Sequence, residues 1–327
     1  MKEKVERKRG LLPLLVIFGF ACREPSPQPP VADAVPSFSA TASDLSAAST
    51  LPAKPSAPPA VFPLEIGSLA TNASHIDVCR STCRIPPSEL RGTEHVRLFR
   101  FEGKATATIP GGQLDAFLLV LEGGATLQTA SGTTRLETWR VARLVGQSAQ
   151  VEGDDNAVIL VALATDAPDL KDATRAAAPS ASPETPSVVD LRSVPELVWA
   201  GGKSGARIAF ESGRSSFGLI MMASEGEVPE HEHEGSVEAL FGLSGAKWLY
   251  VAPKPNEPVD MLAQVQGILV DPGAFARAPR GHRHLGARFH GDAGKAPFIA
   301  VQMYVPPGPE QRFRALAEKE KASASPR

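Results

Sequence analysis

Short apolar runs recur in two stretches of the chain and are separated by turn residues. They cover 96–101, 117–121 and 157–161 in the first stretch, and 217–222, 247–251 and 298–304 in the second. The runs contain many β-branched and aromatic residues, and glycine-rich turn signals such as 122–124 and 153–156 lie between them. Short strands broken by turns are typical of a sandwich or barrel, and neither stretch shows a sustained helical period. The pattern therefore predicts an all-β protein with two structured blocks.

The two blocks resemble each other. Residues 119–125 (Leu-Val-Leu-Glu-Gly-Gly-Ala) align without a gap on residues 240–246 (Leu-Phe-Gly-Leu-Ser-Gly-Ala), as after an internal duplication. Residues 166–187 contain many Ala, Ser and Pro residues, which predicts a linker. We therefore expect two barrels, at 63–165 and 188–310. A tail over 311–327 follows, and its charged end from Glu318 is expected to begin as a helix.

The N-terminus has the features of an export signal. Basic residues from Lys2 to Arg9 precede an apolar run, Leu11 to Ala21, that ends at Cys22. The run is shorter than the about 20 residues that span a bilayer, so residues 1–21 are expected to be a signal peptide. The segment 19–22 resembles a bacterial lipobox, although glycine stands where leucine is usual. That resemblance implies lipidation at Cys22; the alternative is an ordinary signal peptide followed by a chance cysteine.

Residues 22–62 consist mostly of Pro, Ala, Ser and Thr. Such a segment buries too little apolar surface to offset the entropy of ordering it, so we expect a disordered, extended spacer between lipid and fold. The expected location is therefore the cell envelope, in the periplasm or on the cell surface. Contact with the membrane is expected through the lipid anchor alone.

Composition narrows the function classes. The 327 residues carry a net charge of −2, with 43% hydrophobic and 21% charged residues, which allows a packed core and excludes wholesale disorder. The near-neutral balance gives no basic field for nucleic acid, so no nucleic-acid partner is expected. Cys79 and Cys83 remain after Cys22, and two cysteines in an oxidising compartment usually form a disulfide. The alternative is a soft-metal site on a helix, with His75 as third ligand.

Five of the seven histidines lie in the second block. His231 and His233 are two residues apart, so both point to one side of a strand. A turn at 234–236 allows Glu238 to return on the next strand, and His284 follows a Pro-x-Gly turn on a neighbouring strand. Three imidazoles and one carboxylate make a mixed N/O site that suits Mn, Fe, Ni, Cu or Zn, with positions left open for water or substrate.

These segments resemble the two signature motifs of the cupin superfamily. The first motif is carried by Gly226, His231, His233, Glu238 and Gly245, and its opening spacer is one residue shorter than usual. The second is carried by Gly273, Pro279, Gly281 and His284, with Arg288 where asparagine is usual. The resemblance covers the second block. It implies a double-stranded β-helix (jelly-roll) barrel that binds a divalent transition metal through His231, His233, Glu238 and His284.

The first block lacks these ligands. Pro110, Gly112 and Phe117 occupy the positions of His231, His233 and Glu238 in the gapless alignment. We interpret it as a degenerate cupin barrel, which makes the chain a bicupin; its expected role is packing, dimerisation or covering the metal-binding barrel. A ligand site without metal is the alternative. The resemblance also implies paired barrels, either as a pseudo-dimer within one chain or in a homo-oligomer.

Other polar residues near the motifs have less certain roles. His282 lies two residues before His284 and is the candidate catalytic residue, as a proton carrier near neutral pH; the alternative is a solvated loop histidine. The glutamates at 230, 232 and 234 are expected to be solvated. Trp248, Tyr250, Gln302 and Tyr304 are expected to pack in the core or on the outer face, with pocket lining as the alternative.

The resemblance implies a metal-dependent enzyme of the oxygenase, decarboxylase, isomerase or lyase class, acting on a small organic or sugar-like acid. Two alternatives remain: a non-catalytic ligand-binding or sensing module tethered to the membrane, and a structural protein that the metal only stabilises. A cavity of about 300 Å³ or more with polar groups besides the ligands would favour binding or catalysis, whereas a closed apolar mouth would favour the structural role.

Overall fold

The computed structural model describes residues 62–64, 66, 76–176, 185–261 and 267–324, which all belong to one compact unit, 57–327. The predicted signal peptide, Cys22 and the spacer up to residue 61 lie outside the described residues. So do His75 and positions 177–184 of the predicted linker. Among the described residues, no helix combines the length and the apolar character needed to cross a membrane.

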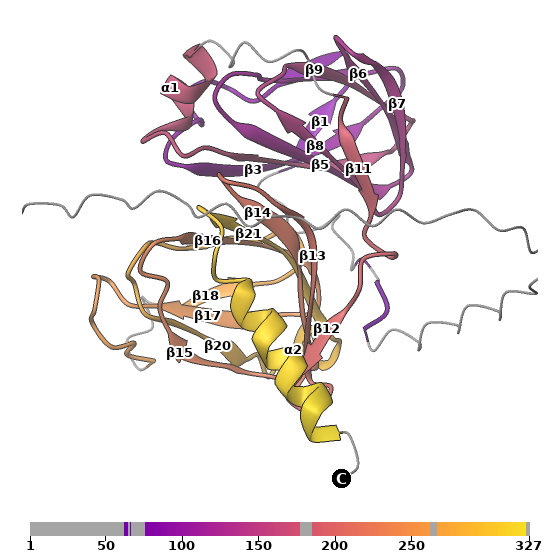
Figure 1. Ribbon diagram of the computed structural model, residues 1–327. Helices are drawn as coiled ribbons and strands as arrows, with labels where there is room; N and C mark the ends of the chain where they lie inside the picture. The colour runs from indigo at the N-terminus through magenta and orange to yellow at the C-terminus, as the bar shows by residue number, and fades with distance from the viewer. Residues whose placement is uncertain (1–61, 65, 67–75, 177–184, 262–266, 325–327) are drawn as a thin grey trace, which may run out of the picture. The chain divides into compact units, whose positions relative to one another are not determined.

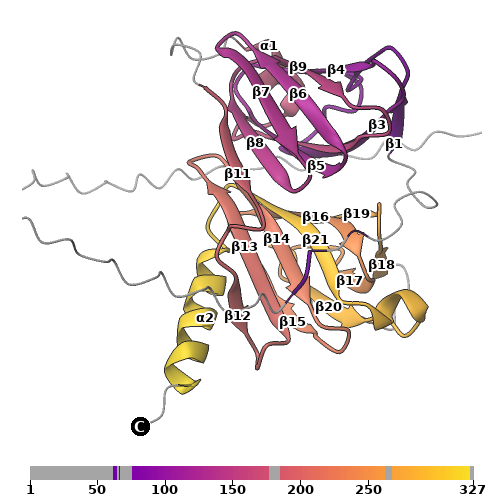
Figure 2. The same cartoon turned by 90° about the vertical axis from the view of Figure 1, so that its right-hand side faces the viewer.

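The first barrel is built from two sheets (Figures 1 and 2). The larger sheet has the order β1-β3-β10-β5-β8-β11 and the smaller one the order β2-β4-β9-β6-β7. The strands are β1 (Ile76–Cys79), β2 (Thr82–Arg84), β3 (Glu94–Phe101), β4 (Thr106–Ile109), β5 (Asp115–Glu122), β6 (Gly124–Thr129), β7 (Gly132–Glu137), β8 (Arg140–Val145), β9 (Ala149–Gly153), β10 (Val158–Ala164) and β11 (Ser187–Asp190). A core of buried apolar side chains from both sheets fills the space between them.

The second barrel also consists of two sheets, with the orders β12-β13-β14-β21-β16-β19 and β15-β20-β17-β18. Its strands are β12 (Leu197–Trp199), β13 (Ser204–Glu211), β14 (Ser216–Met222), β15 (Val228–His231), β16 (Val237–Ser244), β17 (Lys247–Val251), β18 (Gly267–Val270), β19 (Phe275–Ala278), β20 (His284–Arg288) and β21 (Phe298–Val305). A short 3-10 helix, Asp292–Lys295, precedes the last strand. The inner core of this barrel is small, which leaves room for a cavity.

The two barrels share one topology. The order β3-β10-β5-β8 in the first corresponds to β14-β21-β16-β19 in the second, and β4-β9-β6-β7 corresponds to β15-β20-β17-β18. Taken along the chain, β3 to β10 therefore match β14 to β21 one by one. The two segments that align in sequence lie at equivalent places: residues 119–125 cover the end of β5 and the turn after it, and residues 240–246 cover the end of β16 and the turn after it. The predicted fold of two double-stranded β-helix barrels is confirmed.

The larger sheets are buried on both faces. In β5, Phe117, Leu119 and Leu121 belong to a core cluster that also contains residues of the second barrel, whereas the residues between them face the interior of the first barrel. The ring of Phe117 stacks on that of Phe217 of β14, with centroids 4.8 Å apart. Strands buried on both faces are apolar throughout rather than alternating. The two barrels thus pair within one chain, as the pseudo-dimer interpretation expects.

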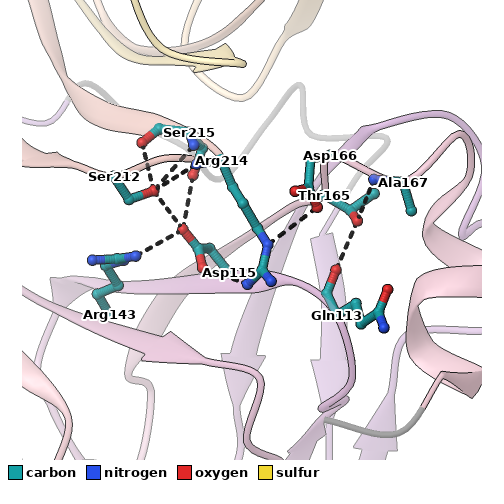
Figure 3. A network of polar contacts seen from close by, with 9 residues as sticks. All are labelled: Gln113, Asp115, Arg143, Thr165, Asp166, Ala167, Ser212, Arg214 and Ser215. Carbon is teal, nitrogen blue, oxygen red and sulfur yellow. Dashed lines mark hydrogen bonds and ion pairs between the residues drawn. The ribbon is translucent and has the colours of Figure 1, made fainter. Parts of the chain in front are cut away.

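A buried carboxylate adds a polar connection between the barrels (Figure 3). Asp115, at the start of β5, is fully buried. It accepts hydrogen bonds from Ser212 (2.8 Å) and Ser215 (3.2 Å) in the turn between β13 and β14, and from Arg143 of β8 (3.0 Å). Arg214 forms an ion pair with it at 3.7 Å. One carboxylate therefore fixes a turn of the second barrel onto the sheet of the first.

The linker between the barrels contains more structure than its composition predicts. Helix α1 (Leu170–Arg175) begins after Asp169, whose side chain accepts a hydrogen bond from the backbone N–H of Lys171. Leu170 and Ala173 of this helix are buried. Strand β11 pairs antiparallel with β8, so it extends the first barrel's sheet. The expected domain boundary between 187 and 188 therefore falls inside a strand of the first barrel.

The chain before the first barrel contacts the second. Phe62 is only 3% exposed, and its ring lies so close to Gly205 of β13 that a Cβ there would come within 3.1 Å of the ring. The backbone N–H of Phe62 donates a hydrogen bond to Glu196, just before β12, at 3.2 Å. Phe62 thus docks on the barrel that follows later in the sequence.

The predicted tail contains helix α2 (Gln311–Ala324), which starts seven positions before the expected Glu318 and packs beside β12 (Figure 1). Phe313 stacks on Trp199 of β12, with ring centroids 5.1 Å apart, and Ala317 is buried. The apolar positions Phe313, Leu316 and Ala317 follow the i, i+3, i+4 spacing of one helix face. This helix is part of the second barrel rather than a free tail.

Candidate metal centre

Four side chains from separate parts of the second barrel converge at one end of it. His231 is the last residue of β15, His233 follows two residues later, Glu238 is near the start of β16, and His284 begins β20. The antiparallel pairing of β15 with β20 places His231 directly opposite His284, while Glu238 arrives from the other sheet. One ligand atom from each of the four lies within 4.8 Å of the others. The structure thus brings together every residue of the predicted metal site.

Backbone carbonyls orient two of the imidazoles. Nδ1 of His231 donates to the carbonyl of Pro229 at 2.8 Å, and Nδ1 of His284 donates to the carbonyl of His282 at 3.0 Å. Each ring therefore directs its Nε2 atom toward the cluster. Such a contact to the second ring nitrogen fixes the tautomer and rotation of a metal-binding histidine.

The carboxylate of Glu238 is held from both sides. Its Oε2 atom lies 2.9 Å from Nε2 of His284 and 3.3 Å from Nε2 of His233. Its Oε1 atom accepts hydrogen bonds from the side-chain amide of Gln302 and from the hydroxyl of Tyr304, the latter at 3.4 Å. One oxygen is therefore fixed by the protein, and the other faces the imidazoles.

Burial and hydrogen bonding set the charges in this cluster. Burial alone would raise the pKa of Glu238, but the hydrogen bonds from His233 and His284 outweigh it and lower that pKa well below its usual value. Burial likewise opposes protonation of His284, yet the hydrogen bond to Glu238 raises its pKa. The pKa of His231 falls to about 4, first because of burial and then because of His284. At neutral pH Glu238 is an anion and His231 is neutral, as metal ligands must be.

The donor chemistry fits a transition metal. Three imidazole nitrogens and one carboxylate oxygen suit divalent first-row ions, whereas Mg²⁺ and Ca²⁺ prefer oxygen ligands alone. The buried carboxylate of Glu238 attracts positive charge at this point and raises the pKa of His284. A divalent cation would meet that demand, with His231, His233, Glu238 and His284 as its ligands.

A cavity of ≈ 330 Å³ adjoins the cluster. All four candidate ligands line it, and so do Trp248, Gln302 and Tyr304, which the sequence analysis expected to pack in the core or on the outer face. Helix α2 contributes Arg312, Phe313 and Leu316 to the wall. The volume exceeds the threshold of about 300 Å³ set for a binding or catalytic site, and polar groups other than the ligands reach it.

His282 does not lie where the sequence analysis placed it. Its imidazole is not part of the cavity wall, and its Nδ1 atom lies 2.8 Å from the carbonyl of Ala252 instead. The strand β20 begins only at His284, so the alternation that would put both residues on one face does not extend back to His282. What His282 gives to the site is its backbone carbonyl, which accepts from His284.

The glutamates around the histidines are partly paired rather than simply solvated. Arg283 forms ion pairs with Glu230 at 3.4 Å and with Glu232 at 3.5 Å. Because the side chain of Arg283 is 46% exposed, these pairs contribute little to stability. They do offset part of the negative charge of this glutamate-rich segment.

Of three residues that support the site, sequence reasoning named Gln302 and Tyr304 with pocket lining only as the alternative, and it missed Lys247. Gln302 and Tyr304 are polar residues at i and i+2 in an otherwise apolar strand, β21, and this spacing is a signal that they share a face. Lys247 is buried, and its Nζ atom donates to the carbonyls of Ser224 (2.7 Å) and Gly226 (2.6 Å). It thereby fixes the loop that leads into β15, although nothing in the sequence pattern marks it.

The first barrel offers no equivalent cluster at the aligned positions. Phe117 lies in the core that the two barrels share, and large side chains such as Phe99, Phe101 and Leu118 fill the barrel interior. The packing role predicted for this barrel agrees with these contacts. Cys79 and Cys83 are joined by a disulfide bond in the structure, so their sulfur atoms are bonded to each other rather than free for a soft metal.

No protein-family model matches the sequence, and a comparison with curated proteins finds no match. Solved structures do match in fold. One structure of oxalate decarboxylase has a TM-score of 0.50 at 11% identity, over 67% of this chain and 69% of the other. The oxalate decarboxylase from Bacillus subtilis at pH 4.6 gives 0.49 at 11% identity with the same coverage. A putative glyoxylate-induced protein from Pseudomonas aeruginosa gives 0.49 at 11% identity, over 65% and 74%. At such low identity the likeness concerns the fold alone, and this fold is that of a bicupin.

Proposed function

We propose that this protein is an exported, metal-dependent enzyme of the cell envelope, of the oxygenase, decarboxylase, isomerase or lyase class, acting on a small organic acid. The observation that carries the proposal is the convergence of His231, His233, Glu238 and His284 within 4.8 Å, beside a cavity of ≈ 330 Å³. A purely structural ion would need no adjoining space for a ligand.

The residues of the site have distinct roles in this proposal. A bound divalent metal would act as a Lewis acid toward the oxygen atoms of a substrate. Glu238 would be a ligand rather than the general base, because Gln302 holds its Oε1 atom while its Oε2 atom faces the imidazoles that would share the metal. Burial, together with the nearby charges of Glu238 and Glu310, raises the pKa of Tyr304 well above its usual value. Tyr304 therefore keeps its proton, and its hydroxyl donates a hydrogen bond to Oε1 of Glu238.

The second candidate function is a non-catalytic ligand-binding or sensing module. It is favoured by the position of His282, the predicted proton carrier, whose ring is directed at the carbonyl of Ala252 rather than at the cavity. The cavity-lining Lys247 and Gln302 also direct donors at protein groups. A binding module needs the metal and the cavity but no general base.

The proposed location rests on the sequence of residues 1–22, with export by the signal peptide and lipidation at Cys22. The disulfide between Cys79 and Cys83 supports it, since such bonds persist in oxidising compartments and are rare in the cytosol. Growth with a radiolabelled fatty acid tests the anchor: label is expected in the parent protein and absent from a Cys22→Ser variant.

Metal analysis of the protein isolated from its native compartment, followed by dioxygen uptake with a panel of organic acids, tests the function. Iron with substrate-dependent uptake selects an oxygenase, and product formation without uptake selects the other enzyme classes. Metal and ligand binding without turnover selects the binding module. The His284→Ala variant is expected to lose metal while the exposed-site control His290→Ala keeps it. Full metal occupancy in His284→Ala would contradict the assigned site.

A further inference from the structure

The cavity wall is dominated by aromatic and aliphatic side chains. Trp199, Trp248, Phe298 and Phe313 line it, together with aliphatic residues such as Ile220, Met222 and Leu240. Aromatic residues make up only 6% of the sequence, so five of them around one cavity, counting Tyr304, are a marked concentration. Aromatic walls favour ring-shaped ligands through stacked and edge-to-face contacts, in addition to the apolar area that they bury.

Most polar groups of the wall already have partners within the protein. Six polar residues line the cavity besides the four candidate ligands: Ser204, Glu227, Lys247, Gln302, Tyr304 and Arg312. Gln302 donates both to Glu238 and to Tyr304, the latter at 2.9 Å. Lys247 donates to two backbone carbonyls, and the charge of Glu227 acts on it. A polyhydroxylated ligand would leave many of its own polar groups without partners in such a cavity, which is costly.

One arginine reaches the cavity close to the histidine cluster. Arg312 lines the cavity from α2, and the ring of its neighbour Phe313 lies 6.4 Å from that of Tyr304, whose hydroxyl contacts Glu238. A divalent cation on the three imidazoles and Glu238 would leave a net charge of +1 there. One end of the cavity therefore attracts an anion, while the rest is apolar.

From these walls and charges we propose that the cavity binds an aromatic monocarboxylate of about one ring. Its carboxylate lies toward the histidine cluster and Arg312, and its ring lies against Trp199, Trp248 and Phe313. The volume of ≈ 330 Å³ is near the lower end of the range for small-molecule sites, which fits a compact ligand. The inference rests on the proposed function for the metal at the carboxylate end, and it narrows the small organic or sugar-like acid expected from the sequence to an aromatic one.

Calorimetric titration of the full chain, with and without Zn²⁺, tests the proposal with three probes: phenylacetate, its neutral analogue phenylacetamide, and the hydrophilic acid gluconate. Phenylacetate is expected to bind at least tenfold more tightly than gluconate, and more tightly than phenylacetamide. Phenylacetate should also change the tryptophan emission, because two of the three tryptophans line the cavity. Equal or tighter binding of gluconate would overturn the proposal.

Two variants of α2 locate the ligand. Arg312→Met is expected to weaken phenylacetate binding roughly tenfold, the size of one exposed charge-assisted contact, and to leave phenylacetamide binding unchanged. Lys319→Met removes an equal charge from an exposed position of the same helix that does not line the cavity, and should change neither. Leu316→Gln should weaken both aromatic probes. Identical binding of phenylacetate to all three variants would contradict the assigned orientation.

Metal content measured on the same samples separates this inference from the proposed function. Bound Zn²⁺ without phenylacetate binding would refute the ligand class while leaving the metal site intact. Phenylacetate binding without any Zn²⁺ binding would support the ligand class and contradict the metal-dependent function.

Discussion

Gln302 is the most informative residue for testing how the metal centre is supported. Its side-chain amide donates to Oε1 of Glu238, and both residues are buried. The Gln302→Leu substitution keeps most of the volume but removes the donor, so Oε1 is left in an apolar cavity without its shorter hydrogen bond. The carboxylate then loses the contact that directs its other oxygen, Oε2, toward the imidazoles of His233 and His284.

The expected loss follows from the geometry. Removing a hydrogen bond to a metal ligand typically lowers metal affinity about 10- to 100-fold, equal to about 1.4–2.7 kcal/mol. The contact from Tyr304 to the same oxygen is longer, 3.4 Å, and hydrogen bonds weaken with distance. Tyr304→Phe is therefore expected to cost less than about tenfold, on the same affinity scale. The order of the two effects is as much a part of the prediction as their size.

Competition for Zn²⁺ against a chelating dye measures these affinities directly. Met303→Leu is a matched control, since Met303 is the neighbouring residue of β21 and lies in the core between the barrels, away from the cavity. It should change stability by less than about 1.5 kcal/mol and leave Zn²⁺ affinity unaltered. Parental affinity in Gln302→Leu, or a larger loss in Tyr304→Phe, would refute the argument that Gln302 orients Glu238.

Three further predictions concern stability. Asp115→Ala should lower the free energy of unfolding by about 3 kcal/mol. This is the lower end of the range for a broken buried ion pair, because the partners Arg143 and Arg214 are partly exposed. Urea titration measures the loss, and a value below about 1 kcal/mol would contradict the anchoring role. Burial raises the pKa of Glu310 above its usual 4.5, so the folded protein binds this proton more tightly than the unfolded chain does. The protonated side chain therefore stabilises the folded state at low pH, and this contribution is lost as pH rises through the raised pKa. Glu310→Gln should therefore flatten the dependence of the urea midpoint on pH above about 4.5, and an unchanged dependence would refute the assignment. Zn²⁺ at 100 times its dissociation constant should stabilise the fold by about 2.7 kcal/mol, with the gain abolished in His284→Ala; an equal gain in both proteins would place the ion elsewhere.

The strands and the candidate ligands could be predicted from the sequence because both depend on short-range pattern. Apolar runs between turn residues predict the strands, and the spacing from His231 to Glu238 places two histidines and a carboxylate at the ends of neighbouring strands. The Pro-x-Gly turn before His284 suggested a fourth ligand, and the resemblance between motifs supported it, because its pairing with β15 joins residues more than 50 positions apart.

Features that depend on tertiary packing could not be predicted in the same way. Six of the 14 residues of helix α2 are charged, and its one aromatic side chain, Phe313, finds a stacking partner only once Trp199 is in place. Strand β11 is four residues long and lies at the end of a segment with linker composition. His282 was assigned to the cavity by strand alternation, but the strand begins only two residues later. In each case local sequence left several conformations open, and contacts distant along the chain select among them.

The crossed connections between the two halves have a mechanical consequence. Phe62 precedes the first barrel yet is anchored on β13 of the second, and β11 follows the linker yet completes a sheet of the first. A pulling force on the N-terminal end of the protein would act through Phe62 on the second barrel, which contains the histidine cluster, before it strained the first barrel. The order in which the two barrels unfold under force is thus set by the barrel on which each segment packs rather than by the position of that segment in the sequence.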